Sequence, residues 1–269
     1  MTCAPVNLKV FIYSNLRYFP HAISPRGDNF TLRVVSKSDI PDDMKGRRAQ
    51  AEQTRTRILD AAEERFAQAG VDRTRLEDVA KDVGIRRGAI FHYFRGKQEL
   101  YEAMLSRIGE NLMSRLRMAL VGRETLPDRM EAALLTWINF TAERPAFPRL
   151  ILRLAADASD ADRPAVERFA SPFMTLLEET LERGEREGLL EPIIKDPLQL
   201  AATIAGSTVF FLATMPAVVP ANEKFDPLSP ERLEAHRRDA LLIAQLLAGI
   251  SPSDQGKRAG KPTRLAREA

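Results

Sequence analysis

Residues 74–100, TRLEDVAKDVGIRRGAIFHYFRGKQEL, decide the fold. Apolar side chains recur there with the spacing of one helix face: Leu76, Val79, Ala80 and Val83. Gly84 follows this helix, and because glycine tolerates a positive φ we expect a tight turn there. A second short helix is predicted to begin at Arg86 or Arg87. Two short helices joined by such a turn form a helix-turn-helix, predicted here to begin at Arg75 and to end at Phe94.

The second helix of this motif has the residues that a DNA-reading helix needs. In a helix-turn-helix this helix enters the major groove while the other crosses the sugar-phosphate backbone. Gly88 and Ala89 are small, so the helix backbone can approach DNA closely. Arg86 and Arg87 precede them as donors for phosphates or for the edges of guanine. A solvated basic face without a groove role is the alternative interpretation of these two arginines.

Helices are also predicted on both sides of the motif. From about Ala49 the pattern is helical, and Gly70 marks the end of that helix. Its apolar stripe consists of Ile58, Ala62, Phe66 and Ala69. Thr74 with Glu77 three residues later predicts a capping box. A fourth helix is predicted from Lys97, with four side chains facing inward: Leu100, Met104, Leu105 and Ile108.

Composition excludes several classes of protein. There are 40 Lys and Arg against 37 Asp and Glu, a net charge of +3, so nucleic-acid binding requires a local basic surface. One cysteine and three scattered histidines predict no disulfide framework, no metal site and no cofactor. We also find no phosphate loop or nucleophile elbow, and hence expect no catalytic residue. Residues 201–219 are interrupted by polar residues and are interpreted as a buried helix of a cytoplasmic protein.

The chain divides into four predicted parts. Residues 1–43 are either a disordered native extension or the product of a mis-annotated start, with Met44 as the true first residue. From Met44, the sequence MKGRR forms a basic arm with Arg47 and Arg48 that leads into the DNA-binding domain, 44–108. A helical regulatory and dimerisation domain follows at 109–250. Residues 251–269, polar and rich in Lys and Arg, are predicted to be a disordered basic tail.

The stretch 74–100 resembles the signature of the TetR/AcrR family of bacterial regulators. The matching positions are Thr74, Ala80, Gly84, Ile85, Gly88, Phe91, Tyr93, Phe94, Lys97 and Leu100. The resemblance implies an all-α fold: an N-terminal three-helix helix-turn-helix DNA-binding domain followed by an α-helical domain that binds a ligand and dimerises. It also implies a transcriptional repressor whose partners are double-stranded DNA and a small-molecule effector.

The resemblance assigns roles to individual residues of the motif. It implies that Thr74 contacts a phosphate, that His92 and Tyr93 face the DNA, and that Lys97 places its ammonium on the backbone. Ala89 stands where the family often has Thr, and Phe91 where it often has Tyr. These two departures remove hydroxyls that bind phosphate or base. The arginines and the arm around Arg47 and Arg48 are therefore expected to contribute more.

Each of these residues also has a simpler structural interpretation. Thr74 is compatible with helix capping alone, and Tyr93 with an ordinary surface aromatic. For Phe91 and Phe94 we favour a place in the core over one at the interface.

Two helices of the regulatory domain, 198–212 and 233–250, are apolar over much of their circumference, which predicts helices buried on several sides. They begin at Leu198 and Leu233 and end at Leu212 and Ile250. We expect them to form a homodimer as a four-helix bundle, with a purely internal core as the alternative.

A ligand pocket is expected to draw on the aromatic residues of the same domain, and such residues are otherwise plain core. The candidates are Trp137, Phe140, Phe147, Phe173 and Phe210, with Leu154, Phe169, Met174 and Phe211 nearby in sequence. Arg144, Arg149 and Arg153 with Asp157 fit either an anion site or surface ion pairs.

Three functions are consistent with the sequence to different degrees. A ligand-responsive repressor predicts a palindromic operator, which an inducer releases by changing the dimer geometry. A ligand-independent architectural DNA-binding protein predicts weak sequence preference. An enzyme is disfavoured by the missing catalytic motifs.

Overall fold

The computed structural model describes residues 42–157, 162–220 and 225–249. Within these ranges the regular secondary structure consists of ten α-helices, as the predicted all-α fold requires. None of these helices has the length and hydropathy that a membrane span requires. The predictions for residues 1–41 and for the tail from 251 lie outside the described residues.

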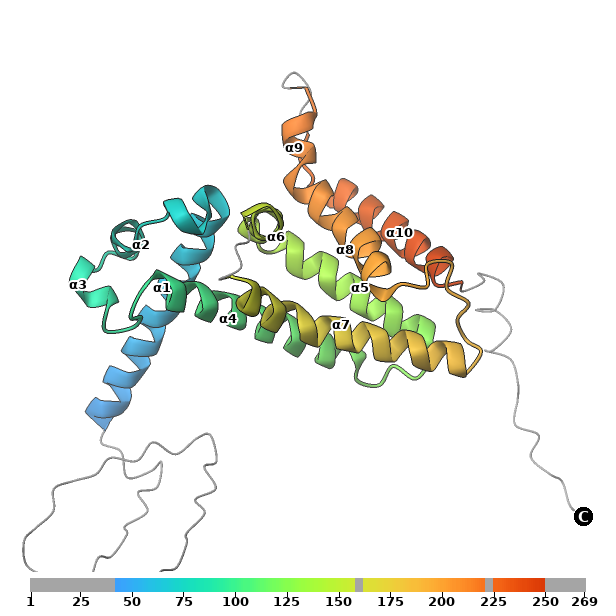
Figure 1. Cartoon of the computed structure of the whole chain (residues 1–269), viewed down its shortest axis with the longest axis horizontal. Helices are drawn as coiled ribbons and strands as arrows, with labels where there is room; N and C mark the ends of the chain where they lie inside the picture. The colour runs from blue at the N-terminus through green and yellow to red at the C-terminus, as the bar shows by residue number, and fades with distance from the viewer. Residues whose placement is uncertain (1–41, 158–161, 221–224, 250–269) are drawn as a thin grey trace, which may run out of the picture. The chain divides into compact units, whose positions relative to one another are not determined.

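Four helices belong to the N-terminal half and to its connection with the rest (Figure 1). They are α1 (Asp42–Arg73), α2 (Leu76–Val83), α3 (Arg87–Ile90) and α4 (Lys97–Leu120). The predicted starts of α3 and α4 are confirmed. The first helix begins at Asp42, earlier than the expected Ala49, so the described part of the basic arm is helical.

Six further helices form the regulatory half (Figure 1). They are α5 (Leu126–Ala142), α6 (Ala146–Asp157), α7 (Arg163–Arg186), α8 (Pro197–Ala213), α9 (Met215–Val218) and α10 (Pro230–Leu247). Helix α5 packs against α4, α8 and α10, while α7 packs against α4 and α8. The result is a bundle in which α4 forms one of the walls.

The core of the N-terminal half consists of the residues that the periodicity selected. Leu100, Met104, Leu105 and Ile108 of α4 are all buried, as predicted. Phe66 of α1 meets Tyr101 of α4 edge to face, with ring centroids 5.5 Å apart. Burial raises the pKa of Tyr101 to about 12, so its hydroxyl stays protonated at neutral pH.

Gly70 interrupts α1, as the sequence predicted. Its φ of 79° and ψ of 169° lie outside the helical region and inside the range that glycine tolerates best. The chain bends there, and three more residues continue to Arg73 before the motif begins.

Helix α4 runs without interruption through the predicted domain boundary between residues 108 and 109. Its first residues belong to the core of the N-terminal half, and Leu116 near its end is buried in the regulatory half. The boundary predicted from the sequence therefore falls inside a helix that both halves share.

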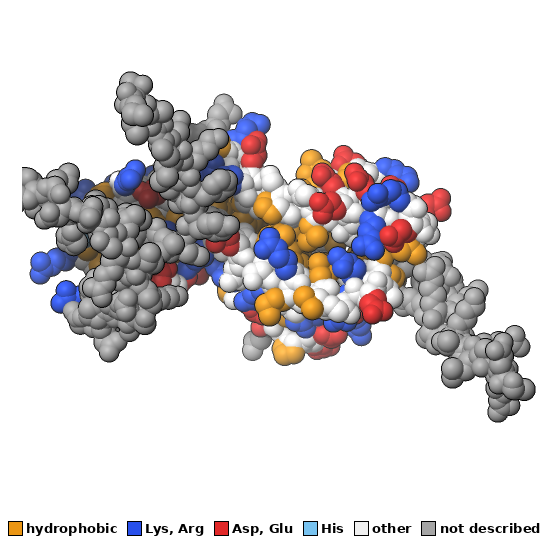
Figure 2. All heavy atoms as spheres, turned by 90° about the horizontal axis from the view of Figure 1, so that it is seen from below, with side chains coloured by type: hydrophobic (Ala, Val, Ile, Leu, Met, Phe, Trp, Pro, Cys, Tyr) orange, Lys and Arg blue, Asp and Glu red, His pale blue; other side chains and the backbone are white. Residues whose placement is uncertain are grey.

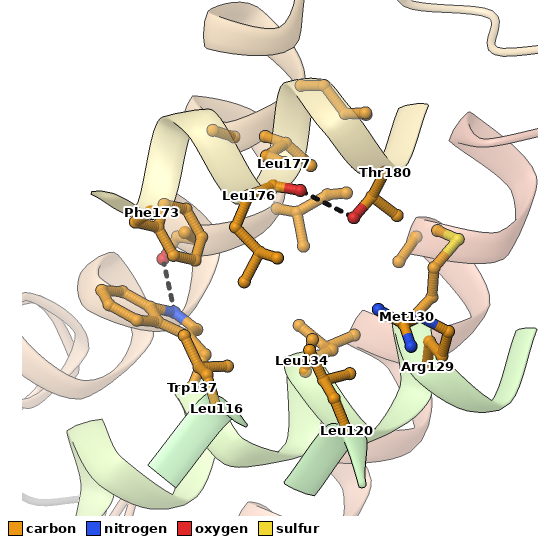
Figure 3. A pocket seen from close by; sticks show the side chains of 16 residues that line it. Leu116, Leu120, Arg129, Met130, Leu134, Trp137, Phe173, Leu176, Leu177 and Thr180 are labelled. Carbon is orange, nitrogen blue, oxygen red and sulfur yellow. Dashed lines mark hydrogen bonds between the residues drawn. The ribbon is translucent and has the colours of Figure 1, made fainter. Parts of the chain in front are cut away.

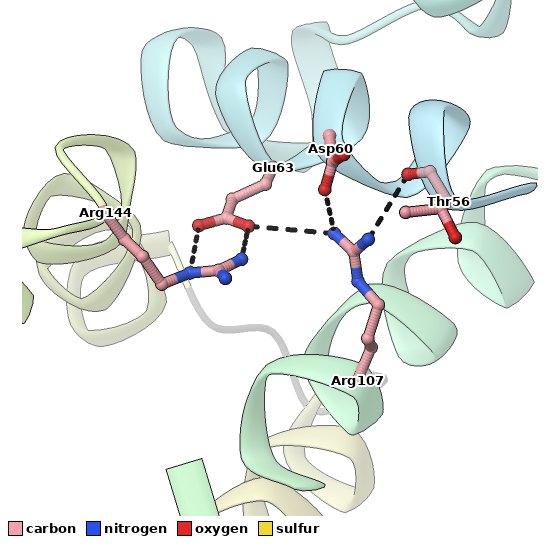
Figure 4. A network of polar contacts seen from close by, with 5 residues as sticks. All are labelled: Thr56, Asp60, Glu63, Arg107 and Arg144. Carbon is pink, nitrogen blue, oxygen red and sulfur yellow. Dashed lines mark hydrogen bonds and ion pairs between the residues drawn. The ribbon is translucent and has the colours of Figure 1, made fainter. Parts of the chain in front are cut away.

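A buried carboxylate joins the two halves a second time (Figure 4). Glu63 of α1 is only 5% exposed, and it accepts hydrogen bonds from Nε and from a terminal nitrogen of Arg144, which precedes α6. Arg107 of α4 lies 3.9 Å from the same carboxylate and 2.7 Å from Asp60, and it donates to the carbonyl oxygen of Thr56 at 3.2 Å. Arg144, predicted to belong to an anion site or a surface pair, thus holds α1 instead.

Helices α8 and α10 are joined by a half-buried histidine. Nε2 of His236 lies 3.1 Å from the Thr208 hydroxyl, and its ring stacks on Phe211 with centroids 4.5 Å apart. Burial lowers the pKa of His236, an effect that Asp239 partly offsets. The imidazole is therefore neutral at pH 7 and suits this apolar stacking.

The Glu63 network yields a prediction for stability. Glu63→Gln removes the charge that two arginines share, so we expect the free energy of unfolding to fall by about 2–4 kcal/mol, because one partner of a buried ion pair is lost. Urea denaturation measures the change. Glu64→Gln, an exposed neighbour, is the control, with an expected change within about 0.5 kcal/mol. Equal effects of the two substitutions would contradict the network's role.

Candidate nucleic-acid interface

The turn between α2 and α3 has the geometry of a left-handed helix cap. Gly84 has a φ of 75°, and its N–H donates to the carbonyl of Lys81 at 3.0 Å. The next amide, of Ile85, donates to the carbonyl of Ala80 at 2.9 Å, which completes a Schellman-type ending. A residue with a Cβ would be strained at this φ, so glycine is required for this turn.

The predicted capping box is wrong. Arg75, not Thr74, is the N-cap of α2, and no side chain caps this helix. Thr74 is 4% exposed, and its hydroxyl donates to the carbonyl of Gly70 at 2.7 Å and lies 3.2 Å from that of Arg65. The Thr74 side chain therefore bonds to the backbone carbonyl at the break in α1. Its hydroxyl is already engaged inside the protein, and its phosphate contact stays a prediction.

Arginines of α1 hold α2 in place. Arg65 donates from two nitrogens to the carboxylate of Asp82, at 2.6 and 2.7 Å. These hydrogen bonds lower the pKa of Asp82, which therefore stays ionised at neutral pH. Arg57 donates to the carbonyl of Val83 at 2.6 Å, at the end of α2. Both contacts fix the angle at which the motif leaves α1.

Helix α3 and the turn that follows it present the predicted reading residues to solvent. Arg86, Arg87, Gly88 and His92 are exposed. The Arg86 side chain has no ion pair or hydrogen bond among the described residues, whereas Nε of Arg87 lies 2.7 Å from Glu77. The Arg87 side chain is 70% exposed, and an exposed pair of this kind contributes about 1 kcal/mol at most, so it exchanges readily for another anion.

No contact inside this chain requires glycine at position 88. A Cβ built at this position would meet no atom within 4 Å. Glycine in a helix costs up to about 1 kcal/mol relative to alanine. A position that accepts this cost without an internal reason fits a surface that another backbone approaches closely.

Ala89, Tyr93 and Lys97 are half-buried at the edge of this surface. The Lys97 ammonium donates to the carbonyl of Asp72 at 2.9 Å, which ties the start of α4 to the end of α1. An ammonium has three donors, so this bond leaves two for another acceptor. Tyr93 packs against the core with its ring.

A place in the core was predicted for both Phe91 and Phe94, but only Phe94 lies there. Phe94 is 1% exposed and lies beneath the guanidinium of Arg55, whose central carbon is 5.0 Å from the ring centroid. Phe91 is 49% exposed, so the prediction was wrong for it. It follows α3 in a turn, where helical periodicity no longer determines which side faces inward. Phe91 therefore adds an apolar side chain to the exposed surface.

Three basic residues near the motif were missed by the sequence analysis. Arg75, Lys81 and Arg95 are exposed, and their side-chain nitrogens have no partner among the described residues. Their only signal in the sequence is positive charge within or directly after the motif, which does not distinguish a ligand-facing residue from a solvated one. Together with Arg86 they give this half the local basic surface that the small net charge required.

The regulatory half contains an apolar cavity of about 120 Å³ (Figure 3). Helices α4, α5, α7, α8 and α10 line it. Of the predicted pocket residues, Trp137 and Phe173 lie in its wall. Phe140 and Phe147 are completely buried and meet edge to face at 5.2 Å, while Phe210 is 53% exposed. These three are not among the lining residues, so the predicted set requires revision.

The aliphatic residues of the cavity wall were missed. Representative members are Leu116, Leu134, Leu176, Leu177 and Ile204. Leucine and isoleucine at helical spacing line cavities and fill cores alike, so the sequence offers no means of selecting them.

Comparison with known proteins places these features in a family. Residues 58–104 match the family model for bacterial regulatory proteins of the tetR family. Nucleoid occlusion factor SlmA of Haemophilus influenzae (strain PittGG) is 26% identical over 125 residues, 44% of this chain. The chain spans 57% of the length of that relative. The HTH-type transcriptional regulator SrpR of Pseudomonas putida is 45% identical over 58 residues, 22% of this chain and 27% of its own.

Solved structures share the fold over a longer stretch. The transcriptional regulator FadR from Bacillus subtilis, crystallised in complex with stearoyl-CoA, superposes with a TM-score of 0.57 at 19% sequence identity. The match covers 73% of this chain and 99% of FadR. Fold and motif together define an all-α protein of the helix-turn-helix class. Residues 58–104 carry the DNA-binding domain of the tetR family of bacterial regulatory proteins.

The exposed arginine of the motif gives a prediction for DNA binding. Arg86→Ala should weaken binding to a selected operator by about 1–3 kcal/mol if it reads guanine, because a bidentate contact is lost. Fluorescence anisotropy with a labelled duplex measures the change. Arg117→Ala, which removes an exposed arginine of α4 outside the motif, is the control and should bind like the unmodified protein. An unchanged affinity of Arg86→Ala would remove this residue from the interface.

Proposed function

We propose that this protein is a homodimeric transcriptional repressor that binds a palindromic operator and is released from it by a small-molecule inducer. The observation that carries the proposal is the exposed helix α3, where the Arg86 side chain has no partner among the described residues and Gly88 is close by. Helix α1 supports this motif, and α4, which follows it, lines an apolar cavity. The family of the chain supports the same function.

DNA binding rests on the shape and charge of the motif. Helix α3 stands at the surface with small residues at its start, so its backbone can enter the major groove. Arg86, Arg75 and Lys81 supply donors for phosphate and base edges. His92 and Phe91 extend the surface beyond the helix. We assign Arg86 and Arg87 to the groove, where Arg87 exchanges Glu77 for DNA.

Dimerisation rests on apolar side chains that the single chain leaves exposed. Helices α8 and α10 were predicted to be buried on several sides, but only a few of their residues are buried in the chain alone. The large exposed apolar residues on them are Leu198, Phe210, Leu242, Ile243 and Leu246. Apolar patches of this kind mark protein interfaces. A second copy that contributes the same two helices would cover them in a four-helix arrangement.

Ligand response rests on the cavity and on its place in the fold. Its wall includes Leu116 and Leu120 of α4, the helix whose first residue, Lys97, holds the end of α1. FadR from Bacillus subtilis, which has the same fold, was crystallised with stearoyl-CoA. A ligand that prefers one position of α4 would shift the population of motif orientations in the dimer.

Selection of bound fragments from random DNA tests this function. We expect enrichment of an inverted repeat whose half-sites lie about one helical turn apart, or a multiple of it, because a two-fold dimer presents two copies of α3. Leu242→Glu should convert the dimer to a monomer in light scattering and weaken operator binding at least a hundredfold. Leu152→Glu changes a leucine of α6 that is 41% exposed, against 51% for Leu242, and as the control it should change neither.

A ligand-independent architectural DNA-binding protein is the second candidate. The observation that favours it is the similarity to a nucleoid occlusion factor, which is longer than the matched region. This function predicts binding to random DNA of any sequence, with the affinity determined by phosphate contacts and salt. Failure to enrich an inverted repeat would therefore support the second candidate and contradict the first.

A further inference from the structure

The two ends of the apolar cavity differ in chemistry (Figure 3). At one end lie the rings of Trp137 and Phe173, with centroids 6.1 Å apart. At the other end lie Arg129, Met130 and Thr180. Aliphatic side chains from α4, α5, α7 and α8 form the walls between the ends. The cavity is thus an apolar passage with a cationic group at one end.

Arg129 is the polar group of this cavity that lacks a partner. Trp137 donates its indole N–H to the carbonyl of Ala205 at 3.3 Å, and Thr180 donates its hydroxyl to the carbonyl of Leu176 at 2.6 Å. Arg129 is half-buried, yet its guanidinium makes no hydrogen bond or ion pair with any described residue. A guanidinium that is partly removed from water without a partner is costly, and an anion beside it would remove that cost.

A polar pocket of about 350 Å³ continues beyond the cationic end. It shares Arg129, Leu176 and Thr180 with the apolar cavity. Its other charged residues are Arg123, Glu124, Glu179, Arg183 and Glu187. Arg183 is already paired with Glu187 at 2.8 Å.

Three arginines and three glutamates line this pocket in total, so it has no surplus of positive charge. A polyanionic head group would meet the glutamates. A head group with one negative charge needs only Arg129. The charge balance therefore favours a monoanion over a nucleotide-bearing ligand.

The surface of the regulatory half also carries hydrophobic side chains beside those of Lys and Arg (Figure 2).

We propose that the cavity binds an amphipathic monoanion, a medium-chain carboxylate, with its carboxylate on Arg129 and its tail against Trp137. Arg129 and Trp137 are both on α5, and their separation of eight residues corresponds to about 12 Å along the helix. An extended chain advances about 1.2 Å per bond, so roughly ten bonds span this distance. This backbone separation sets an upper length of about ten carbons for the chain, and decanoate is the probe of that length. Its role as an inducer rests on the proposed function above, whereas its binding does not.

Trp137 provides the measurement, because it is the only tryptophan of the sequence. Sodium decanoate, titrated below its micelle concentration into the full chain without DNA, should change the Trp137 fluorescence saturably. Decanol, which has the same tail and no charge, should bind about tenfold to a hundredfold more weakly, because a charge-assisted hydrogen bond is absent. Decanoyl-CoA should bind no more tightly than decanoate, since the polar pocket carries no net charge.

Arg129→Gln supplies the decisive variant. It should weaken decanoate by the same factor and leave decanol unchanged, whereas Arg117→Gln, an exposed arginine of α4 outside both pockets, should leave both unchanged. Retained decanol binding by Arg129→Gln also shows that the cavity is still folded. Equal affinities of the unmodified protein for decanoate and decanol, or no fluorescence change with either, would overturn the proposal.

Brominated ligands test the orientation, because bromine quenches tryptophan fluorescence at contact. Decanoate with bromine on the terminal carbon should quench Trp137 strongly, and decanoate with bromine beside the carboxylate should quench it weakly. The reverse order would overturn the assigned orientation. These titrations contain no DNA and measure ligand binding alone. If decanoate binds but does not release operator DNA in a separate binding experiment, only the inducer role is lost. Failure of the proposed function would appear as absence of operator binding itself.

Discussion

The structure depends on a single helix that both halves share. Helix α4 begins at Lys97, whose ammonium holds the end of α1, and its last turns form a wall of the apolar cavity. Its inward residues are buried along the whole length, from Leu100 to Leu116, so no position offers a hinge of low packing. A side chain that shifts against Leu116 or Leu120 thus acts on the same rigid element that supports the helix-turn-helix.

The Glu63 network limits how the halves can move relative to each other. Its carboxylate joins α1 to Arg144, which precedes α6, while Arg107 of α4 contacts both Asp60 and Glu63. The geometry of the contact between Arg107 and Asp60 is that of an ion pair rather than a directed hydrogen bond. The network therefore stabilises the junction between α1, α4 and α6.

The sequence predicted most of the motif because local rules determine it. Gly84 requires a positive φ, the apolar residues of α2 and α4 follow one face, and the family signature covers the same residues. The errors lie where tertiary contacts override local rules. Thr74 closes the break at Gly70 instead of capping α2, and Phe91 leaves the core because α3 ends at Ile90. Arg87 fits the predicted surface, but its pairing with Glu77 depends on how α2 and α3 face each other.

The cavity was less predictable than the motif. Among the aromatic candidates only Trp137 and Phe173 line it, because helix packing and not residue type determines which rings meet in the core. Nothing in the sequence pattern indicated a ligand-binding role for Arg129, because an arginine in the first turns of a helix is ordinarily solvated. Its meaning comes from the three-dimensional arrangement: a half-buried guanidinium without a partner at the end of an apolar passage.

We propose that α4 couples the cavity to the DNA-binding surface, and thermodynamic linkage tests this coupling most directly. Coupling between two sites is reciprocal in free energy, so DNA must alter ligand affinity by the factor by which the ligand alters DNA affinity. The measurement is the dissociation constant of decanoate, read from Trp137 fluorescence, for the free protein and for the protein saturated with its selected operator. We predict weaker decanoate binding to the DNA complex, by the same factor as the loss of operator affinity in decanoate. An unchanged decanoate affinity on operator DNA would contradict the coupling.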